Sequence, residues 1–546
     1  MKIKNKFGGN DMKKKQIFAT ALALTMLCAT ATACGGKKNP DLTNKEVLNI
    51  VIPDLGYGTE WLSGVANGFT AKTGTKVNID VTPNESGYVN AMRAGTAEYD
   101  IYVLRSDPYG LVASNAANVS GYECILADLD DVYESTVEGE NVKFKDKMKD
   151  VYESYNRVDA KGNGEEHYYS VQWCDSIFSL VRNMKVWKDN WIVPNTTNEL
   201  IALCEQIKGE QKTPFIWSTQ ASYWWSVANI WVTQYEGVDA MFGEQGFWNG
   251  YDKDGNVNQP TMWARQGIYE CLDVLDNLMQ EENGYQHALS KSVDFTTAQG
   301  YFLTESMGIA MMANGDWLYN EMKENYSTAS IDMMKMPVVS AIRNHPDCEG
   351  TIESDEELSA LIDAIDELGK DAPLNGMTNY FVSQKAFDKV YEARNVYTCG
   401  GNVNHIMVTP VYSDSISQAK AFYQYLATDE ALKLFAQHSG GFTLCFDSSD
   451  EVKAESQKYA NSFVKSSEAI KQNREVAPWP MNKSRLITLG GMKTFPTIEM
   501  DANEPEKIFA MKKGTGYMTA REMYNQNITN AASKWSVYLS NAGITE

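Results

Sequence analysis

The sequence predicts an α/β fold with a parallel sheet in its N-terminal part and with more than one lobe. Strands and helices alternate between residues 47 and 104, and this order favours a parallel sheet with helices on both faces. The chain has 546 residues, whereas a single core rarely grows past roughly 250–300 residues. Hydrophobic residues make up 43% of the chain and charged residues 22%, a balance that can bury a large core.

Three short segments are predicted strands. Residues 47–52 are mostly apolar, residues 77–81 alternate apolar and polar side chains, and residues 100–104 form a third apolar run. Ligands of such parallel sheets bind outside the carboxyl ends of the strands. The loops at residues 54–60 and 105–109 are therefore the places where a ligand site is expected.

Two helices are predicted between these strands. Thr59 can cap a helix that ends at Gly74. The apolar residues of this helix recur at helical spacing and are Trp61, Leu62, Val65, Ala66 and Phe69. A second helix is expected over residues 86–93. Together with the strands they complete a β-α-β-α-β unit.

The N-terminus has the pattern of an export signal. Three lysines at positions 13–15 precede an apolar run from Ile17 to Leu27, and small residues follow. This run is shorter than the roughly 20 residues of a transmembrane helix. Residues Ala31–Cys34 resemble the bacterial lipobox, in which the cysteine is lipidated. We therefore expect a signal peptide at 1–33, a lipidated Cys34 and a tether at 34–45. The alternative is an ordinary signal peptide with an incidental cysteine.

The charge of the chain excludes two classes of partner. There are 49 basic and 71 acidic residues, and removal of residues 1–33 changes the net charge from −22 to −27. Nucleic-acid binding needs clustered Lys and Arg, and binding to anionic lipid heads also needs positive charge. We expect no nucleic-acid partner, and contact with the membrane only through a lipid at Cys34. The protein would then be exported and anchored to the outer face of the cytoplasmic membrane.

Several segments in the same order resemble a known family. The loop Gly56–Leu62, the turn and strand Ala94–Leu104, the segment Tyr168–Asn183, the segment Phe302–Met322 and the helix pair Ala419–Gly441 resemble the extracellular solute-binding proteins of carbohydrate ABC importers, the maltose-binding protein-like group. The resemblance covers most of residues 46–445. The acidic stretch near 349–371 and the tail after about residue 499 look like additions.

The resemblance implies a two-lobed periplasmic-binding-protein-like fold of type II. Each lobe would hold a mostly parallel sheet flanked by helices, with the ligand cleft between the lobes. The first lobe would contain residues 46–173 and 376–440, and the second residues 174–375 and 441–546. Hinge crossings are expected near residue 173, within 340–375 and near 440.

Aromatic residues are the main candidates for ligand binding. Seven of the 13 tryptophans lie within 59 residues, from Trp173 to Trp231. An indole or phenol ring can cover the apolar face of a sugar and also offer a polar group. The candidates from this reasoning and from the resemblance are Tyr57, Trp61, Trp173, Tyr223, Trp224, Trp317 and Trp479. For each of them the alternative is a place in the core.

Two carboxylates complete the predicted site. The resemblance places a carboxylate that accepts sugar hydroxyls at Asp107, and a hinge carboxylate at Asp175. Asp316 is expected to cap the helix that begins near Trp317. Nucleotide-binding, zinc-protease and serine-hydrolase motifs are absent, so we predict no catalytic residue, no metal site and no cofactor.

The leading hypothesis is a monomeric substrate-binding lipoprotein and not an enzyme. It would capture an oligosaccharide by aromatic stacking and hinge closure and deliver it to the permease of an ABC transporter. One alternative is an exported glycan-active enzyme with two carboxylates roughly 5–10 Å apart. Another is a protein on the same scaffold that captures a non-sugar solute such as a peptide.

Overall fold

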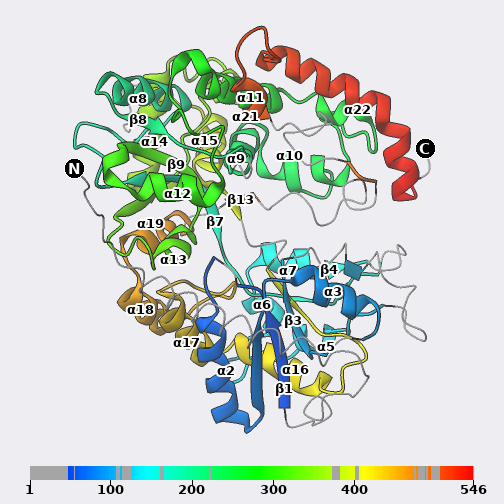
Figure 1. Ribbon diagram of the computed structural model, residues 1–546. Coiled ribbons are helices and arrows are strands. Elements are labelled where there is room, and N and C mark those ends of the chain that lie inside the picture. Colours follow the sequence, from blue (N-terminus) through cyan, green and yellow to red (C-terminus); the bar gives the residue numbers. More distant parts are fainter. Residues whose placement is uncertain are drawn as a thin grey trace, which may run out of the picture.

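The computed structural model shows two α/β lobes, one above the other in Figure 1. It describes residues 47–54, 56–96, 98–105, 111–112, 124–159, 165–219, 223–371, 382–399, 405–472, 475–477, 486, 490–492 and 505–544.

The first lobe is built on a five-stranded sheet. Its strand order is β2 (Lys76–Val81), β1 (Val47–Ile52), β3 (Ile101–Leu104), β12 (Ile406–Val408) and β6 (Val171–Gln172). Strand β1 is parallel to β2 and β3, whereas β12 is antiparallel to β3 and β6. Helices α2 (Glu60–Thr73) and α3 (Glu85–Arg93) connect the parallel strands. The predicted β-α-β-α-β unit is confirmed.

The ends of α2 test the residues that were predicted to start and stop this helix. Gly74 follows the helix with φ 78°, a left-handed conformation that suits glycine. Thr59 occupies the N-cap position, but its side chain makes no capping hydrogen bond. The helix buries the predicted apolar stripe, and most of its stability therefore comes from packing.

The second lobe has a mixed sheet. Its strand order is β13 (Glu475–Ala477), β11 (Val396–Cys399), β7 (Ile177–Asn183), β9 (Ile309–Gly315) and β8 (Thr213–Phe215), and β10 (Ile331–Met334) also pairs with β7. Strand β7 is antiparallel to β9, β10 and β11, while β8–β9 and β11–β13 are parallel. The prediction of a mostly parallel sheet was wrong for this lobe. Strand β7 leaves the junction of the lobes, and β9 returns to it, so that Gly315 lies opposite Phe178.

The chain passes between the lobes at three places. It leaves the first sheet at Gln172 and enters the second at Ile177. It returns between β11 and β12, within residues 399–406, whereas the sequence placed this passage at 340–375. Helix α15 (Gln384–Asn395) packs on α9 (Trp224–Glu236) and α14 (Asp355–Leu368), which keeps this part of the chain in the second lobe.

The third passage follows α17 (Asp429–Ser439). This helix packs on α2 and on α18 (Asp450–Tyr459), and α19 (Ser462–Ile470) packs on β10 of the second lobe. The remaining helices of the first lobe are α5 (Asp130–Tyr133), α6 (Phe144–Lys147), α7 (Asp150–Asn156) and α16 (Ile416–Leu426). Those of the second lobe are α8 (Thr197–Gly209), α10 (Val238–Phe242), α11 (Gln266–Met279), α12 (Phe295–Leu303) and α13 (Leu318–Met322). Strands β4 (Arg157–Val158) and β5 (His167–Tyr168) form a separate pair.

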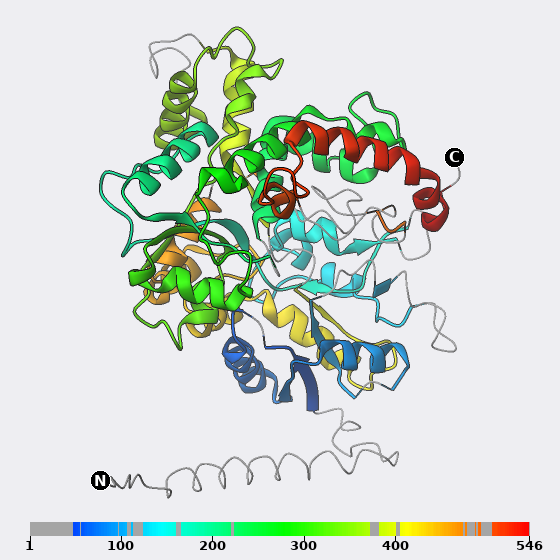
Figure 2. The ribbon, with the colours of Figure 1, turned by 45° about the horizontal axis from the view of Figure 1, so that its top comes forward.

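The C-terminal tail is part of the second lobe. Helices α21 (Pro505–Phe509) and α22 (Ala520–Ala542) pack on α11, and α22 lies along the outer side of the lobe in Figures 1 and 2. Helix α22 begins with a capping box of Thr519 and Glu522. Its buried Met523, Trp535 and Leu539 belong to the main core of the lobe. The tail therefore completes this core.

The acidic stretch forms helix α14, which projects together with α15 at the top of Figure 2. The buried guanidinium of Arg394 on α15 holds Asp366 of α14 with Nη2 2.6 Å from Oδ2. Lys335 binds the same carboxylate at 2.8 Å, and Arg394 also donates to the carbonyl of Met336. One acidic residue of this stretch thus joins the two helices to the sheet.

We predict that Arg394→Met lowers the free energy of unfolding by about 2–3 kcal/mol. It removes several charge-assisted hydrogen bonds and leaves Asp366 with one partner. Chemical denaturation measures the change. Lys385→Met is the control on the same helix, because Lys385 is exposed and 3.4 Å from Asp347, and it should cost under about 0.5 kcal/mol. Equal effects of the two substitutions would contradict this role of Arg394.

Candidate functional site

Aromatic rings from both lobes meet at the junction. Tyr57 follows β1 in the first lobe and Trp317 follows β9 in the second, with ring centroids 6.2 Å apart in an edge-to-face arrangement. Trp317 also lies edge-to-face with Phe178 at 5.0 Å and with Tyr223 at 6.0 Å. Two of the predicted aromatic residues therefore lie beside Trp317.

Two glycines make room for the indole of Trp317. A Cβ atom at Gly56 would lie 2.6 Å from Cδ1 of Trp317, and one at Gly315 would lie 2.3 Å from Cη2. Each distance is far below van der Waals contact. The ring therefore lies directly against the backbone of both lobes, and no larger residue fits at either glycine.

Trp317 and Tyr223 retain exposed ring surface. Both side chains are partly buried, and Trp317 packs against the core of the second lobe and against an apolar cluster that the two lobes share. Burial raises the pKa of Tyr223 to about 12, so its hydroxyl stays protonated at neutral pH and can donate a hydrogen bond. Among the predicted aromatic residues that the structure describes, these two are not fully buried and can offer surface to a ligand.

Trp61 and Trp173 lie in the core of the first lobe. Their rings stack on each other with centroids 4.5 Å apart, and both side chains are 0% exposed. Tyr57 lies edge-on to Trp173, with ring centroids 6.2 Å apart. Trp224 is likewise buried, against Phe215 in the second lobe. Trp61, Trp173 and Trp224 are therefore core residues, which was the alternative to ligand binding for each of them.

Three predicted site residues are outside the part of the chain that the structure describes. These are Asp107, Trp479 and the lipidation candidate Cys34. The signal peptide and the tether are also outside it.

Asp175 is a buried carboxylate between the lobes. It accepts hydrogen bonds from Lys149 and from the hydroxyl of Tyr152, both in the first lobe. Its carboxylate lies 4.0 Å from Nζ of Lys471. The predicted hinge carboxylate is therefore at the junction, but it faces protein cations and not solvent.

Asp316 joins the two lobes. It accepts a hydrogen bond from the Tyr57 hydroxyl, and its Oδ2 lies 3.3 Å from Nζ of Lys471. Burial raises the pKa of the Asp316 carboxyl to about 6, although Lys471 and Tyr57 oppose this shift. The expected capping role was wrong, because helix α13 has no side-chain cap.

Lys471 is a central residue that sequence reasoning missed. It ends helix α19 and its side chain is 3% exposed. Burial alone would lower the pKa of its ammonium group, but the carboxylates of Glu468, Asp175 and Asp316 together raise it above the ordinary value. A single lysine at a helix end gives no sequence signal that distinguishes it from a surface residue.

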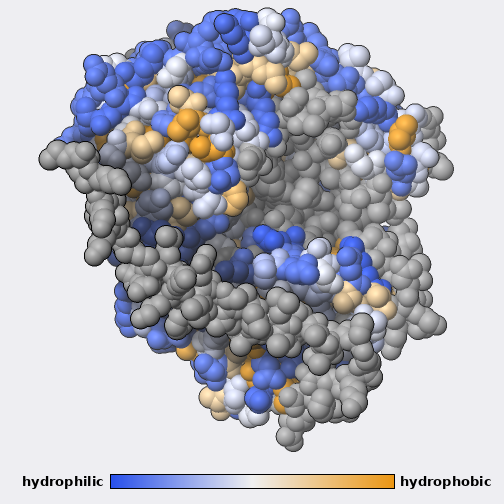
Figure 3. Space-filling model, in the orientation of Figure 1, coloured by the Kyte–Doolittle hydropathy of each residue, from blue (hydrophilic) through white to orange (hydrophobic). Residues whose placement is uncertain are grey.

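An open hollow of about 650 Å³ lies on the first lobe. Its lining comes from the carboxyl ends of β2 and β3 and from helix α3, and consists of Pro83, Glu85, Ser86, Val89, Asn90, Arg93 and Arg105. Glu85 accepts hydrogen bonds from the backbone and side chain of Arg105, at 2.7 and 3.0 Å. Side-chain donors and acceptors of this kind can bind hydroxyl groups. On the face shown in Figure 3 the surface is also recessed between the lobes.

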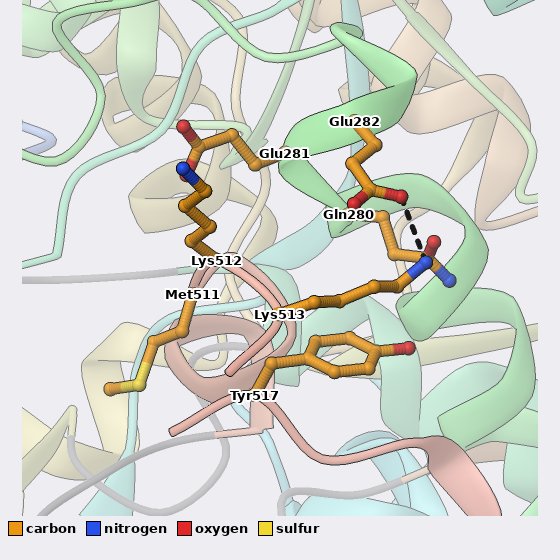
Figure 4. A pocket seen from close by; sticks show the side chains of 7 residues that line it. All are labelled: Gln280, Glu281, Glu282, Met511, Lys512, Lys513 and Tyr517. Carbon is orange, nitrogen blue, oxygen red and sulfur yellow. Dashed lines mark hydrogen bonds and ion pairs between the residues drawn. The ribbon is translucent and has the colours of Figure 1, made fainter. Parts of the chain in front are cut away.

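A second hollow, of about 240 Å³, lies on the C-terminal tail (Figure 4). Three of its four charged side chains form ion pairs: Lys513 is 2.8 Å from Glu282, and Glu281 binds Lys291 at 2.9 Å. None of the predicted site residues that the structure describes lines it. We therefore do not assign it to ligand capture.

One group of possible metal ligands occurs among the described residues. It consists of Asp128, Asp130 and His167. Nδ1 of His167 lies 2.7 Å from Asp130, and this hydrogen bond raises the pKa of the imidazole. Nδ1 of His167 is thus already engaged with Asp130, and we assign no metal to this group.

Comparisons with known proteins agree with this geometry. The family described as bacterial extracellular solute-binding protein matches residues 55–433. A solved structure, the SBP RafE in complex with raffinose, matches with a TM-score of 0.52 and 13% sequence identity, over 90% of this chain and 99% of that one. At this identity the likeness shows the fold alone. A search of curated proteins gave no match. Within the described residues, no helix combines the length and apolarity needed to cross a bilayer.

The raised pKa of Asp316 predicts a pH dependence of stability. The folded protein keeps this proton up to about pH 6, whereas the unfolded chain loses it near pH 4. Stability from this group is therefore present at low pH and lost as pH rises from about 4 to about 7, by roughly 2–3 kcal/mol. Chemical denaturation of the wild type and of Asp316→Asn at several pH values isolates the effect. Parallel stability curves for the two proteins would contradict it.

Proposed function

The chain belongs to the bacterial extracellular solute-binding proteins, and we propose that it captures an oligosaccharide between its lobes and delivers it to an ABC permease. The observation that carries the proposal is the pair of partly exposed rings, Trp317 and Tyr223, at the junction of the lobes. Trp317 is the main stacking platform in this proposal. Tyr223 adds a second ring and a hydroxyl donor.

The energetics of such a site are sufficient for capture. Each aromatic ring contributes on the order of 1 kcal/mol to contact with the apolar face of a sugar. Polar groups such as Asn90 and Arg105 in the hollow can bind the hydroxyls. Micromolar affinity needs about −8 kcal/mol in total, which two or three rings with several hydrogen bonds can supply. The raffinose bound to RafE supports a sugar as the ligand class.

Closure of the lobes is the mechanism in this proposal. Trp317 belongs to the second lobe and lies edge-to-face with Tyr57 of the first, so a ligand that stacks on Trp317 and also contacts the first lobe prefers the closed arrangement. The permease would recognise this closed shape. Members of this family bind solutes and the site shows no catalytic arrangement among the described residues, so we propose capture without chemical conversion.

The location follows from the family and from the N-terminal pattern. As a member of an extracellular family the protein is exported. We propose that Cys34 carries the lipid that holds it at the outer face of the cytoplasmic membrane, and that it acts as a monomer. Asp107 and Trp479 remain proposed ligand contacts. A peptide or another non-sugar solute is the second candidate ligand on this scaffold.

A thermal-shift screen tests the ligand class. We expect raffinose or a malto-oligosaccharide at 100 times its Kd to raise the melting temperature by about 2–3 °C, because the ligand binds only the folded state. Peptides should give no shift. A shift with peptides alone would reject the sugar proposal, and release of new reducing ends during incubation would show an enzyme instead.

Trp317→Ala tests the stacking platform. We expect sugar affinity to fall about tenfold or more, equivalent to about 1.4 kcal/mol, because the ring face is lost. Calorimetric titration measures the affinity. Trp187→Ala is the matched control, since Trp187 is also partly buried but packs against Trp191 away from the junction. Unchanged affinity with a collapsed melting temperature would show that Trp317 has only a core role.

A further inference from the structure

A continuous set of buried polar contacts joins the two lobes beneath the aromatic rings. It begins at Tyr57 of the first lobe, whose hydroxyl donates to Asp316 of the second. The other oxygen of the Asp316 carboxylate faces Lys471 at 3.3 Å. The side chains of Asp316 and Lys471 are 0% and 3% exposed, so water does not compete for these contacts.

Lys471 connects Asp316 to the first passage of the chain between the lobes. Its ammonium group donates to the backbone carbonyl of Asp175, and to Oε1 of Glu468 at 2.9 Å. The ammonium group thus hydrogen-bonds to two segments, the 173–176 passage and helix α19, and forms an ion pair with a third, the β9–α13 turn.

The contacts then return to the first lobe. The Asp175 carboxylate accepts from Lys149 at the start of α7 and from Tyr152 within α7. Both Tyr57 and Tyr152 belong to an apolar cluster that the first lobe shares with strands β7, β9 and β10 of the second. The set therefore starts and ends in the first lobe and has Asp316 and Lys471, from the second lobe, at its centre.

The charges in this set depend on the contact between the lobes. Two cations, Lys149 and Lys471, lie among three carboxylates, Asp175, Asp316 and Glu468. A buried charge is strongly unfavourable unless it is paired and hydrogen-bonded. If the lobes separate at the Tyr57 side, Asp316 loses the donor that the first lobe supplies.

We propose that Asp316, held by Tyr57 from one lobe and by Lys471 from the other, is a latch that keeps the lobes together and fixes the ring of Trp317 at their boundary. Asp316 directly precedes Trp317, and its backbone N–H donates to the carbonyl of Ile177 at 3.0 Å. Tyr57, Asp316 and Lys471 are therefore positioning residues for the ring and do not themselves need to touch a ligand. The role of the ring in sugar binding rests on the proposed function, whereas the joining of the lobes does not.

Tyr57→Phe tests the latch in the free protein, without any solute. The substitution keeps the ring and its contacts with Trp317 and Phe442 and removes only the hydroxyl. We expect amide exchange of residues 316–321 to accelerate about tenfold or more, because a charge-assisted hydrogen bond is lost. Small-angle scattering should show a larger radius of gyration.

Tyr423→Phe is the matched control. Tyr423 is also fully buried, but its hydroxyl bonds Thr409 at 2.8 Å within the first lobe. It should leave the radius of gyration and the exchange of residues 316–321 unchanged. The latch is overturned if Tyr57→Phe behaves like wild type in both measurements, or if Tyr423→Phe has the same effect on residues 316–321.

A charge-balanced pair of variants tests Lys471. Lys471→Met leaves Asp175 and Asp316 with too little positive charge and is expected to lower the melting temperature strongly or to prevent folding. Lys471→Met combined with Asp316→Asn removes one charge of each sign, and this double variant should melt higher than the single one and show the enlarged radius of gyration. A double variant that is no more stable than the single one, or that keeps the wild-type radius, would overturn the latch. Because no solute is present, failure of the sugar screen would leave this result unaffected.

Discussion

Burial of charge at the junction is the constraint on which the arrangement of the lobes depends. Lys471 is acceptable in a dry interior only because carboxylates from three segments surround it. Two of these carboxylates are in turn bound by side chains of the first lobe. Removing one member leaves the others buried and unpaired, so the set acts as a unit. The position of the Trp317 ring depends on this unit, since Asp316 and Trp317 are neighbours in the chain.

The junction also explains why the site has small residues beside large ones. Gly56 and Gly315 lie on opposite lobes, and each leaves space for the indole of Trp317. The tryptophan can therefore approach both backbones and still keep part of its ring exposed. Trp61 and Trp173 have no such space and stack on each other inside the first lobe. The same residue type thus serves as core in one place and as a candidate binding surface in another.

Sequence reasoning succeeded where local pattern determines structure. The strand–helix alternation over residues 47–104 gives the parallel part of the first sheet, and Gly74 marks a helix end correctly. It failed where the outcome depends on distant segments. Strand direction in the second sheet follows from how β7 leaves the junction, and the return passage within 399–406 follows from the packing of α15 on α9. Lys471 could not be found because its three carboxylate partners include two that are more than 150 residues away in the chain.

The packing of α22 has a consequence for the order in which the protein is assembled. Strands of the second sheet come from residues as far apart as 177 and 477, and the last helix covers α11 only at residues 520–542. Helix α9 can cover one side of α11 early, but the side that α22 covers stays exposed during synthesis until residues 520–542 have been made. The first sheet is complete by residue 408. Contacts of such long range make folding slow. The sheet of the first lobe can therefore form before the second lobe is complete, since the core of the second lobe needs its C-terminal helix.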